Sequence, residues 1–515
     1  LYFLLSGLYD AIQTRHVLAF MGFLGFVNVY ALRVNLSVAL VAMVNHTAIS
    51  TNHTANYTQE CRPEGFNETT EKLQDGKFIW NEYQQGIALG AFFYGYVVTQ
   101  IPGGRLAERF GAKWLYGVGV LITALLTLLT PVAATWSFYA FVALRVMMGL
   151  GEGVTFPAMH AMIARWLPKD ERSFLSTVIY SGGQIGTVIA MPISGILCDS
   201  TFLGGWPAAF YVFGLIGIVW FVFWALLVSN NPQEHPRISD EERIYIETNQ
   251  GEEQAREKLP IPWRAVLSSL PFWALMLTHF GQNWGFYTLL TELPSYLKNI
   301  LHFDIKQNGF VSALPYLVGT VTSWGAGFLA DHIRRKDLFS TSIIRKFFNS
   351  VSVFYGAQSL DLFGIFVKNF ECIGNLNWLL FCPLVHLFHF KSIKLFSLFV
   401  AGTLMGMTNA FANMAGFLAP LAVGSLTNNN ETITQWSIVF YIASGTYIIT
   451  GSIFVLFGSA ELQPWGLYAQ TRGTNFAGAL GTLGADPSGT VPYQATDDGT
   501  PESPKSDDAF PTEAY

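Results

Sequence analysis

The chain has 515 residues, of which 51% are hydrophobic and only 12% are charged, and its mean hydropathy is +0.35. Soluble proteins carry about a quarter charged residues. This composition therefore excludes a soluble globular protein and predicts a multi-pass protein embedded in the lipid bilayer. The formal charge of −6 says little about partners, because much of the acid lies in the tail after Glu461. We expect no nucleic-acid partner.

The four cysteines are scattered along the chain without metal-binding spacing. We therefore expect no metal and no cofactor. The sequence shows neither a catalytic nucleophile paired with a general base nor a phosphate-binding loop. We therefore expect that the protein is not an enzyme. The chain opens at Leu1 without a methionine, and we expect the true start to lie upstream.

Apolar segments long enough to cross a bilayer as helices recur along nearly the whole chain, which predicts an all-α membrane protein. We predict twelve spans, at about 17–44, 84–104, 114–134, 137–163, 174–198, 208–229, 272–297, 309–330, 351–367, 376–390, 395–426 and 435–458.

The spans divide into two pseudo-symmetric six-helix bundles, at 1–229 and 271–460. A charged, proline-punctuated cytosolic connector at 230–270 joins them, and Ser239 is predicted to cap a surface helix within it. The tail at 461–515 is rich in Gly, Pro, Ser, Thr and Asp and is predicted to be cytosolic and disordered.

A polar loop at 45–83 separates the first two spans and contains four glycosylation triplets. Such triplets are used only on the lumenal or external side. The predicted acceptors are Asn45, Asn52, Asn56, Asn67 and, in a later loop, Asn430. With twelve spans, both termini are then cytosolic.

A glycine and basic pattern follows the second span and recurs after the eighth, as GGRLAERFGAKW and GFLADHIRRK. Glycine permits a tight turn, and basic residues mark cytosolic loops. The repeat indicates two related halves, and we predict that these loops switch conformation during transport. Their residues are Gly104, Arg109, Gly111, Lys113, Gly327, Asp331 and Arg335.

The segment Phe138–Trp166 places three ionisable residues, Arg145, Glu152 and His160, in one apolar run. In a continuous helix they share one stripe, with about 10.5 Å between the first two. Charges at that depth are costly and usually mark a substrate or ion pathway. Arg33, a lone cation in the first span, is a second pathway candidate. The alternative is structural: Arg145 tied to Glu152 or to carbonyls, and His160 merely packed.

The seventh span carries Asn283, Tyr287 and Glu292 shortly before Pro294. Proline frees a backbone carbonyl and bends a helix, which is a common way to open a binding region. We predict that Asn283 and Tyr287 contact substrate. Glu292 has either a direct role or a place at the lumenal mouth.

Several phrases resemble one family: YALRVNLSVAL, GLGEGVTFPAMHAM, FYTLLTELPSYLKNIL and AGTLMGMTNAFANMAGFLAPLAVG. They are similar to the anion:cation symporters of the major facilitator superfamily, which include sialin, vesicular glutamate transporters and type I sodium/phosphate transporters. The resemblance implies a twelve-helix major facilitator fold. It also implies proton-coupled symport of an organic anion, such as sialic acid or another acidic sugar, by a monomer in a lysosomal, vesicular or plasma membrane.

By the same resemblance, Arg33 and Arg145 bind the substrate carboxylate, while Glu152 and His160 match positions suited to proton coupling. The sequence departs from the family at two of its positions. Met148 stands where sialin has a further glutamate, and Gln282 where vesicular glutamate transporters have an arginine. Two alternatives remain open: a sodium-dependent phosphate cotransporter, and a relative that does not transport.

The segment 352–399 resembles nothing in the family, and its apolar runs are short and interrupted by charges. A gene-model error, such as a translated intron, explains it better than the evolution of a new segment.

Overall fold

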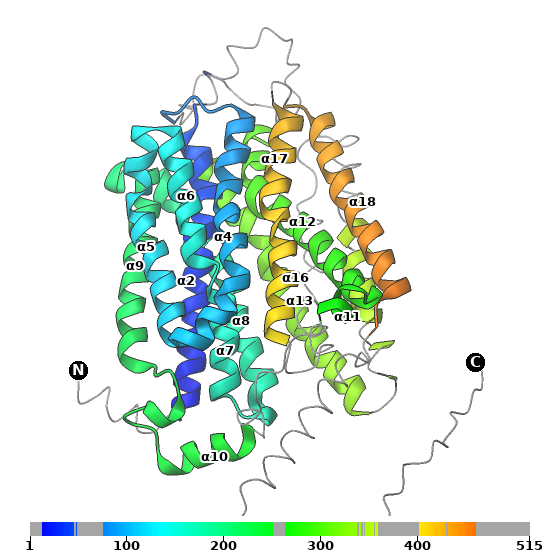
Figure 1. Cartoon of the computed structure of the whole chain (residues 1–515). Coiled ribbons are helices and arrows are strands. Elements are labelled where there is room, and N and C mark those ends of the chain that lie inside the picture. The colour runs from blue at the N-terminus through cyan, green and yellow to red at the C-terminus, as the bar shows by residue number, and fades with distance from the viewer. Residues whose placement is uncertain are drawn as a thin grey trace, which may run out of the picture.

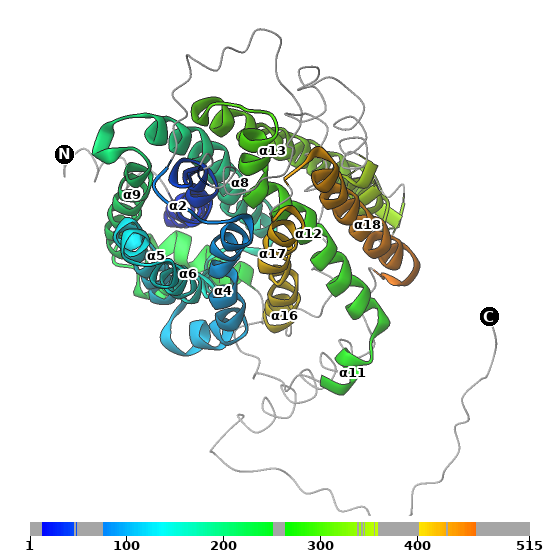
Figure 2. The same cartoon turned by 90° about the horizontal axis from the view of Figure 1, so that it is seen from above.

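The structure, a computed structural model, describes residues 13–45, 48, 76–250, 263–336, most of 339–358, 401–428 and 431–459. Within these ranges the regular structure is helical, and the single β-type contact is an isolated bridge between Val44 and Phe78. Figure 1 shows long helices lying side by side, and Figure 2 shows the same bundle from above. The all-α prediction is confirmed.

The N-terminal half accounts for all six of its predicted spans. Its helices are α2 (Thr14–Met43), α4 (Glu82–Phe110), α5 (Ala112–Trp136), α6 (Phe138–Glu152), α7 (Thr155–Trp166), α8 (Lys169–Asp199) and α9 (Trp206–Leu227). A large core of buried apolar residues, including Phe26, Trp166 and Trp224, holds this half together.

The prediction of one continuous helix over Phe138–Trp166 is wrong in detail, because α6 ends at Glu152 and α7 begins at Thr155. Pro157 explains the interruption, since it has no N–H with which to bond the Gly153 carbonyl. The two short helices together still form one span that is long and apolar enough to cross a membrane.

The C-terminal half is described in part. Its helices are α12 (Leu270–Asn299), α13 (Ile305–Arg335), α16 (Ala401–Asn413), α17 (Ala415–Thr427) and α18 (Ile433–Phe457), preceded by the short α11 (Trp263–Leu267). Where a ninth span was predicted from 351, helical structure begins earlier, near 343, and is described to 358. The predicted span at 376–390 lies outside the described residues. Seven spans in the described part of the chain are long and apolar enough to cross a membrane.

The predicted surface helix in the connector is α10 (Asp240–Gln250), and the Ser239 hydroxyl accepts a hydrogen bond from Glu242 N, as a cap does. Glu242 in turn binds the start of α2, accepting bonds from the backbone nitrogens of Thr14 and Arg15 at 2.9 and 3.0 Å. The Arg15 guanidinium pairs with Glu242 at 3.2 Å and with Glu171 at 2.8 Å. The connector helix is thereby tied to the N-terminal half.

The two halves meet closely at the end of the bundle where α2 ends, α4 begins, α17 ends and α18 begins, at the top of Figure 1. We call this the sequon end. A Cβ added at Gly86 would lie 2.5 Å from the Pro420 carbonyl oxygen, and one at Gly309 would lie 2.6 Å from that of Met191. Thus α4 packs on α17, and α8 on α13, with almost no space between backbones (Figure 2). The structure is closed at the sequon end.

The turn between the second and third spans contains fewer residues than predicted, because α4 continues through Gly104 and Arg109 to Phe110. Gly111 alone makes the turn, with φ of +90°. Asn230 packs against it, and the Asn230 side-chain oxygen accepts a hydrogen bond from Lys113 N at 3.3 Å. Gly327 and Asp331 likewise lie inside α13, and Arg335 is its last residue.

Replacing Gly111 with alanine is expected to destabilise the protein by about 1–3 kcal/mol, because a non-glycine residue at this φ is strained. The new Cβ would also lie 2.8 Å from the Asn230 side-chain nitrogen. Thermal unfolding in detergent measures the loss. Gly445→Ala in α18 is the matched control, since no atom lies within 4 Å of its Cβ. Equal melting temperatures for the two variants would contradict the prediction.

Candidate functional site

Arg33 lies midway along α2 and is 5% exposed. Its guanidinium donates to Glu152 Oε1 from Nε at 3.0 Å and also from one terminal nitrogen. Four aromatic rings surround the guanidinium at 4.7–5.7 Å: Tyr30, Phe92, Phe93 and Tyr96. Ring faces stabilise a cation that has left water, so α2 and α4 together hold the Arg33 charge inside the bundle.

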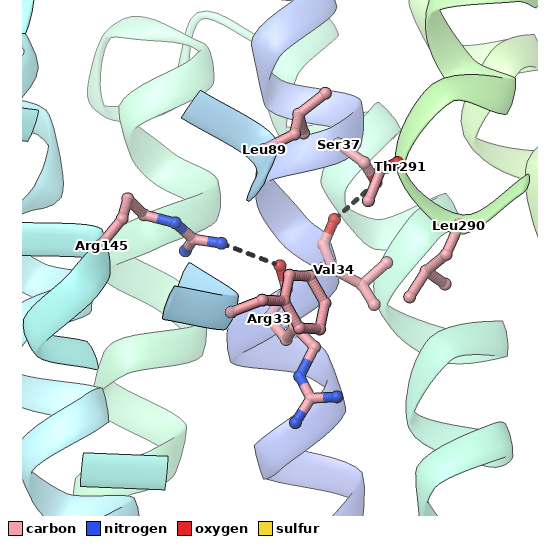
Figure 3. Close-up of a pocket in the computed structure, with 8 residues that line it drawn as sticks. Arg33, Val34, Ser37, Leu89, Arg145, Leu290 and Thr291 are labelled. Atoms are coloured by element: carbon pink, nitrogen blue, oxygen red, sulfur yellow. Dashed lines mark hydrogen bonds between the residues drawn. The ribbon is translucent and has the colours of Figure 1, made fainter. Parts of the chain in front are cut away.

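Arg145 of α6 lies beside this pair and is 2% exposed. Figure 3 shows its side chain reaching the backbone of α2, where one terminal nitrogen donates to the Arg33 carbonyl at 3.4 Å. The other terminal nitrogen lies 3.8 Å from the Met148 sulfur, and Nε has no hydrogen-bond partner within the described part of the chain. No carboxylate of the described residues forms an ion pair with Arg145.

The charges of this cluster do not balance. Two buried arginines, Arg33 and Arg145, share one buried carboxylate, Glu152, whose Oε2 has no hydrogen-bond partner among the described residues. A buried charge without a partner is costly, and an anion placed against Arg145 would offset that cost. The cluster is therefore suited to bind an anion.

A small cavity opens beside the two arginines, between the N-terminal helices and α12. It is lined by Arg33, Val34, Ser37, Leu89, Phe93, Arg145, Leu290 and Thr291 (Figure 3). Its free volume of about 10 Å³ holds about one water molecule. A larger ligand needs the halves to move apart, as expected for a site that opens by rearrangement of the bundles.

Tyr287, predicted to contact substrate, is 3% exposed, packs on Phe93 with ring centroids 4.5 Å apart, and starts a chain of polar groups. Its hydroxyl donates to the Asn413 side-chain oxygen, and the Asn413 side-chain nitrogen donates to the Asn409 carbonyl at 2.7 Å. The Asn409 side-chain nitrogen donates to Gln100 Oε1 at 2.8 Å. These hydrogen bonds cross from the C-terminal half to α4.

The sequence analysis did not identify Gln100, Asn409 or Asn413 as site residues. A signal was present, since Asn409 and Asn413 are spaced by four and fall on one face of a helix. Buried amides of this kind are typical of sites that recognise hydroxyl groups.

Of the predicted substrate and proton residues, only Arg33 and Arg145 line the cavity. Glu152 is bound to Arg33, and Tyr287 packs on Phe93, whereas two further residues lie away from these contacts.

His160 lies on α7 with its ring 5.1 Å from that of Tyr180, and it is not among the lining residues. His160 lies eight residues after Glu152, which places it about 80° around the helix from Glu152. Asn283 is half-buried on α12 and likewise does not line the cavity.

Among the predicted glycosylation sites, Asn45 is described, and its side-chain oxygen accepts a hydrogen bond from Ala48 N at 2.8 Å. The other four acceptors, Asn52, Asn56, Asn67 and Asn430, lie outside the described residues. Glycosylation therefore stays a prediction.

The chain is similar to known transporters in sequence and in fold. A family model described as Major Facilitator Superfamily matches residues 16–388. Human sialin is 42% identical over 461 residues, which are 88% of this chain and 91% of that protein. A Drosophila melanogaster protein named "Putative inorganic phosphate cotransporter" is 41% identical over 462 residues, 88% of this chain and 86% of that protein.

Human vesicular glutamate transporter 2 is 35% identical over 459 residues, 88% of this chain and 75% of that protein. Among solved structures, a D-xylose-proton symporter matches with a TM-score of 0.62 at 14% identity, covering 87% of this chain and 99% of that one. These findings confirm both the resemblance and the fold expected from the sequence.

Proposed function

Because this chain belongs to the Major Facilitator Superfamily, we propose that it is a proton-coupled symporter of organic anions such as sialic acid or another acidic sugar. Like its family and its relatives, the protein is a membrane transporter and not an enzyme. The observation that carries the proposal is the Arg145 guanidinium, which is buried beside a cavity and forms no ion pair with a carboxylate of the described residues.

In the proposed mechanism the substrate carboxylate binds Arg145, since a guanidinium presents a planar fork that matches a carboxylate and stays charged at physiological pH. The amides of Gln100, Asn409 and Asn413 are suited to substrate hydroxyls once the halves separate.

Glu152 links the proton to the anion. When ionised, the Glu152 carboxylate forms an ion pair with the Arg33 guanidinium and neutralises its charge. When protonated, it no longer neutralises Arg33, and the site gains a second cation available to the substrate. Proton binding and anion binding therefore favour each other, which is the thermodynamic condition for symport.

Sodium-dependent phosphate cotransport is the second candidate. The similarity to the Drosophila melanogaster protein supports it, and a site with surplus positive charge also suits phosphate. For either function we propose a monomer in a lysosomal, vesicular or plasma membrane, with both termini cytosolic and the sequon end lumenal or external.

Uptake into proteoliposomes tests the proposal. The full chain is reconstituted, and uptake of radiolabelled sialic acid and of radiolabelled phosphate is measured with an imposed pH gradient and with Na⁺ exchanged for choline. We expect sialic acid uptake that depends on the pH gradient and persists in choline. Phosphate uptake that disappears in choline would establish the second candidate. No flux of either anion would favour a relative that does not transport.

Met148→Glu is expected to weaken anion affinity by about 10- to 100-fold. Met148 is wholly buried with its sulfur 3.8 Å from Arg145, so a carboxylate there would neutralise the free guanidinium and compete with substrate. Met148→Gln is the uncharged control of equal size and should keep affinity within about threefold. The KM for uptake, or competition binding, measures both, and an unchanged KM in Met148→Glu would contradict the prediction.

A further inference from the structure

A hydrogen bond between two buried amides joins the halves on the side of the cavity that faces away from the sequon end. The Asn409 side-chain nitrogen of α16 donates to Gln100 Oε1 of α4 at 2.8 Å, and the two residues are 9% and 1% exposed. Along α4, which begins at the sequon end, Gln100 lies seven residues, about 10.5 Å, beyond the cavity residue Phe93. We call the pair of Gln100 and Asn409 the amide lock. It lies between the central cavity and the opposite end of the bundle.

The backbones of α4 and α16 are also close at the amide lock (Figure 2). Gly406 of α16 is buried, and a Cβ added there would lie 3.6 Å from the Gln100 carbonyl oxygen, which is an ordinary van der Waals contact. Opening the cavity toward this end moves the two halves apart. The hydrogen bond between Asn409 and Gln100 must then break.

The hydrogen-bonding capacity of the amide lock is only partly used. The Gln100 side-chain nitrogen is buried without a hydrogen-bond partner among the described residues. The Asn409 side-chain oxygen accepts from the Asn413 side-chain nitrogen at 3.1 Å, and Asn413 accepts from the Tyr287 hydroxyl. The Tyr287 ring packs on Phe93 in the cavity wall. Because an unpaired buried N–H group is costly, a ligand that supplies an acceptor to Gln100 is favoured.

A hydroxyl group can take the place of either partner in the amide lock, because it both donates and accepts hydrogen bonds. Placed between the two side chains, one hydroxyl accepts from the Asn409 nitrogen and donates to Gln100 Oε1. A second hydroxyl accepts from the unpaired Gln100 nitrogen. One hydrogen bond between the halves is thereby exchanged for up to three hydrogen bonds to the ligand. An ionised carboxylate has no donor, so it cannot replace Asn409 as the partner of Gln100 Oε1.

We propose that hydroxyl groups of the bound anion open the end opposite the sequon end by replacing the Asn409 to Gln100 hydrogen bond. The amide lock then determines specificity at the opening step, after the carboxylate has bound Arg145. An anion that carries no hydroxyl group fills the arginine site and leaves the lock closed. This inference rests on the proposed transport function and deepens it, because it assigns the selection of hydroxylated anions to two named residues.

The test needs a reporter of opening at the amide lock. Gly406→Cys supplies it, since the added Cβ fits beside Gln100 in the closed form. The four native cysteines are replaced by serine: Cys61, Cys198, Cys372 and Cys382. This parent chain is placed in lipid nanodiscs, and the rate of modification by a charged, water-soluble thiol reagent is divided by the rate for the unfolded chain.

The rate is measured without ligand, with sialic acid and with acetamidocyclohexanecarboxylate. The last compound keeps a six-membered ring, the carboxylate and the acetamido group of N-acetylneuraminic acid, and it has no hydroxyl group. Binding and displacement of radiolabelled sialic acid establish that each ligand occupies the site. Sialic acid should raise the rate about tenfold, whereas the hydroxyl-free acid should leave it at the ligand-free value.

Asn409→Leu and Gln100→Leu each remove the same hydrogen bond, from opposite halves. Both should raise the ligand-free rate about tenfold, because the amide left behind is unpaired in the closed form and regains water in the open form. Asn349→Leu is the matched control. It breaks a buried amide pair, with Gln282 Nε2 at 3.1 Å, that joins two elements of the same half. This control should keep the low ligand-free rate and the rise with sialic acid.

The outcomes separate this inference from the proposed function. Equal ligand-free rates in the parent chain and both leucine variants, or an equal rise with the hydroxyl-free acid, would overturn the inference. Sialic acid that binds without raising the rate would overturn the inference and leave the proposed function standing. Absence of sialic acid binding would overturn both the inference and the choice of sialic acid as substrate.

Discussion

Replacing Glu152 with glutamine is expected to abolish uphill, proton-driven uptake while leaving exchange of anion for anion. Glutamine keeps the size and one hydrogen-bond acceptor for Arg33, yet it carries no titratable proton. Arg33 then stays available at every pH, so anion binding survives but is no longer linked to proton binding. Uptake against a gradient should fall to the level of empty liposomes, and counterflow should persist.

Proteoliposomes loaded with unlabelled substrate measure counterflow, and the same preparation with an acid exterior measures uphill uptake. Glu247→Gln, at an exposed acid of the connector helix α10, is the matched control and should keep both activities. Uptake by Glu152→Gln that retains its full dependence on the pH gradient would remove Glu152 from proton coupling.

Local sequence predicted much of the bundle, because a lipid-spanning helix must be long and apolar and therefore leaves a continuous signal. Ten of the twelve predicted spans correspond to described helices. The ends were predicted less well: α4 continues past Gly104 and α13 past Ala330, since charged residues at a membrane surface remain helical. The irregular stretch 352–399 gave no reliable prediction, because its apolar runs are too short to span.

The candidate site was only half predictable. The high cost of burying charge identified Arg33, Arg145 and Glu152 individually. Their pairing was not in the sequence, since the Arg33 and Glu152 contact joins residues 119 apart and depends on how α2 packs on α6. The predicted stripe grouped His160 with the other two, but eight residues place it about 80° around the helix from Glu152, and its ring packs on Tyr180. Neutral amides such as Gln100 and Asn409 carry no charge whose burial is costly, so only the spacing of Asn409 and Asn413 gave a signal, and the link to Gln100 depends on the contact of α4 with α16.

Arg145→Gln separates the functional interpretation of this arginine from the structural one. If Arg145 were a structural bridge, its removal would destabilise the fold. Its contacts among the described residues are a carbonyl at 3.4 Å, a sulfur at 3.8 Å and the Phe92 ring at 5.5 Å, and its buried charge has no carboxylate partner there. Removing that charge is therefore expected to leave the melting temperature unchanged or raised.

Substrate binding, in contrast, should weaken by about 100-fold or more, as expected when a charge-assisted bond to a buried carboxylate is lost. Arg15→Gln provides the opposite pattern as a control. Arg15 is held by Glu171 and Glu242, so its loss leaves a buried carboxylate unpaired and costs up to about 3 kcal/mol, with little effect on substrate affinity. Melting temperature and KM measured on both variants decide the matter: a destabilised Arg145→Gln that binds substrate normally would make this arginine a structural element.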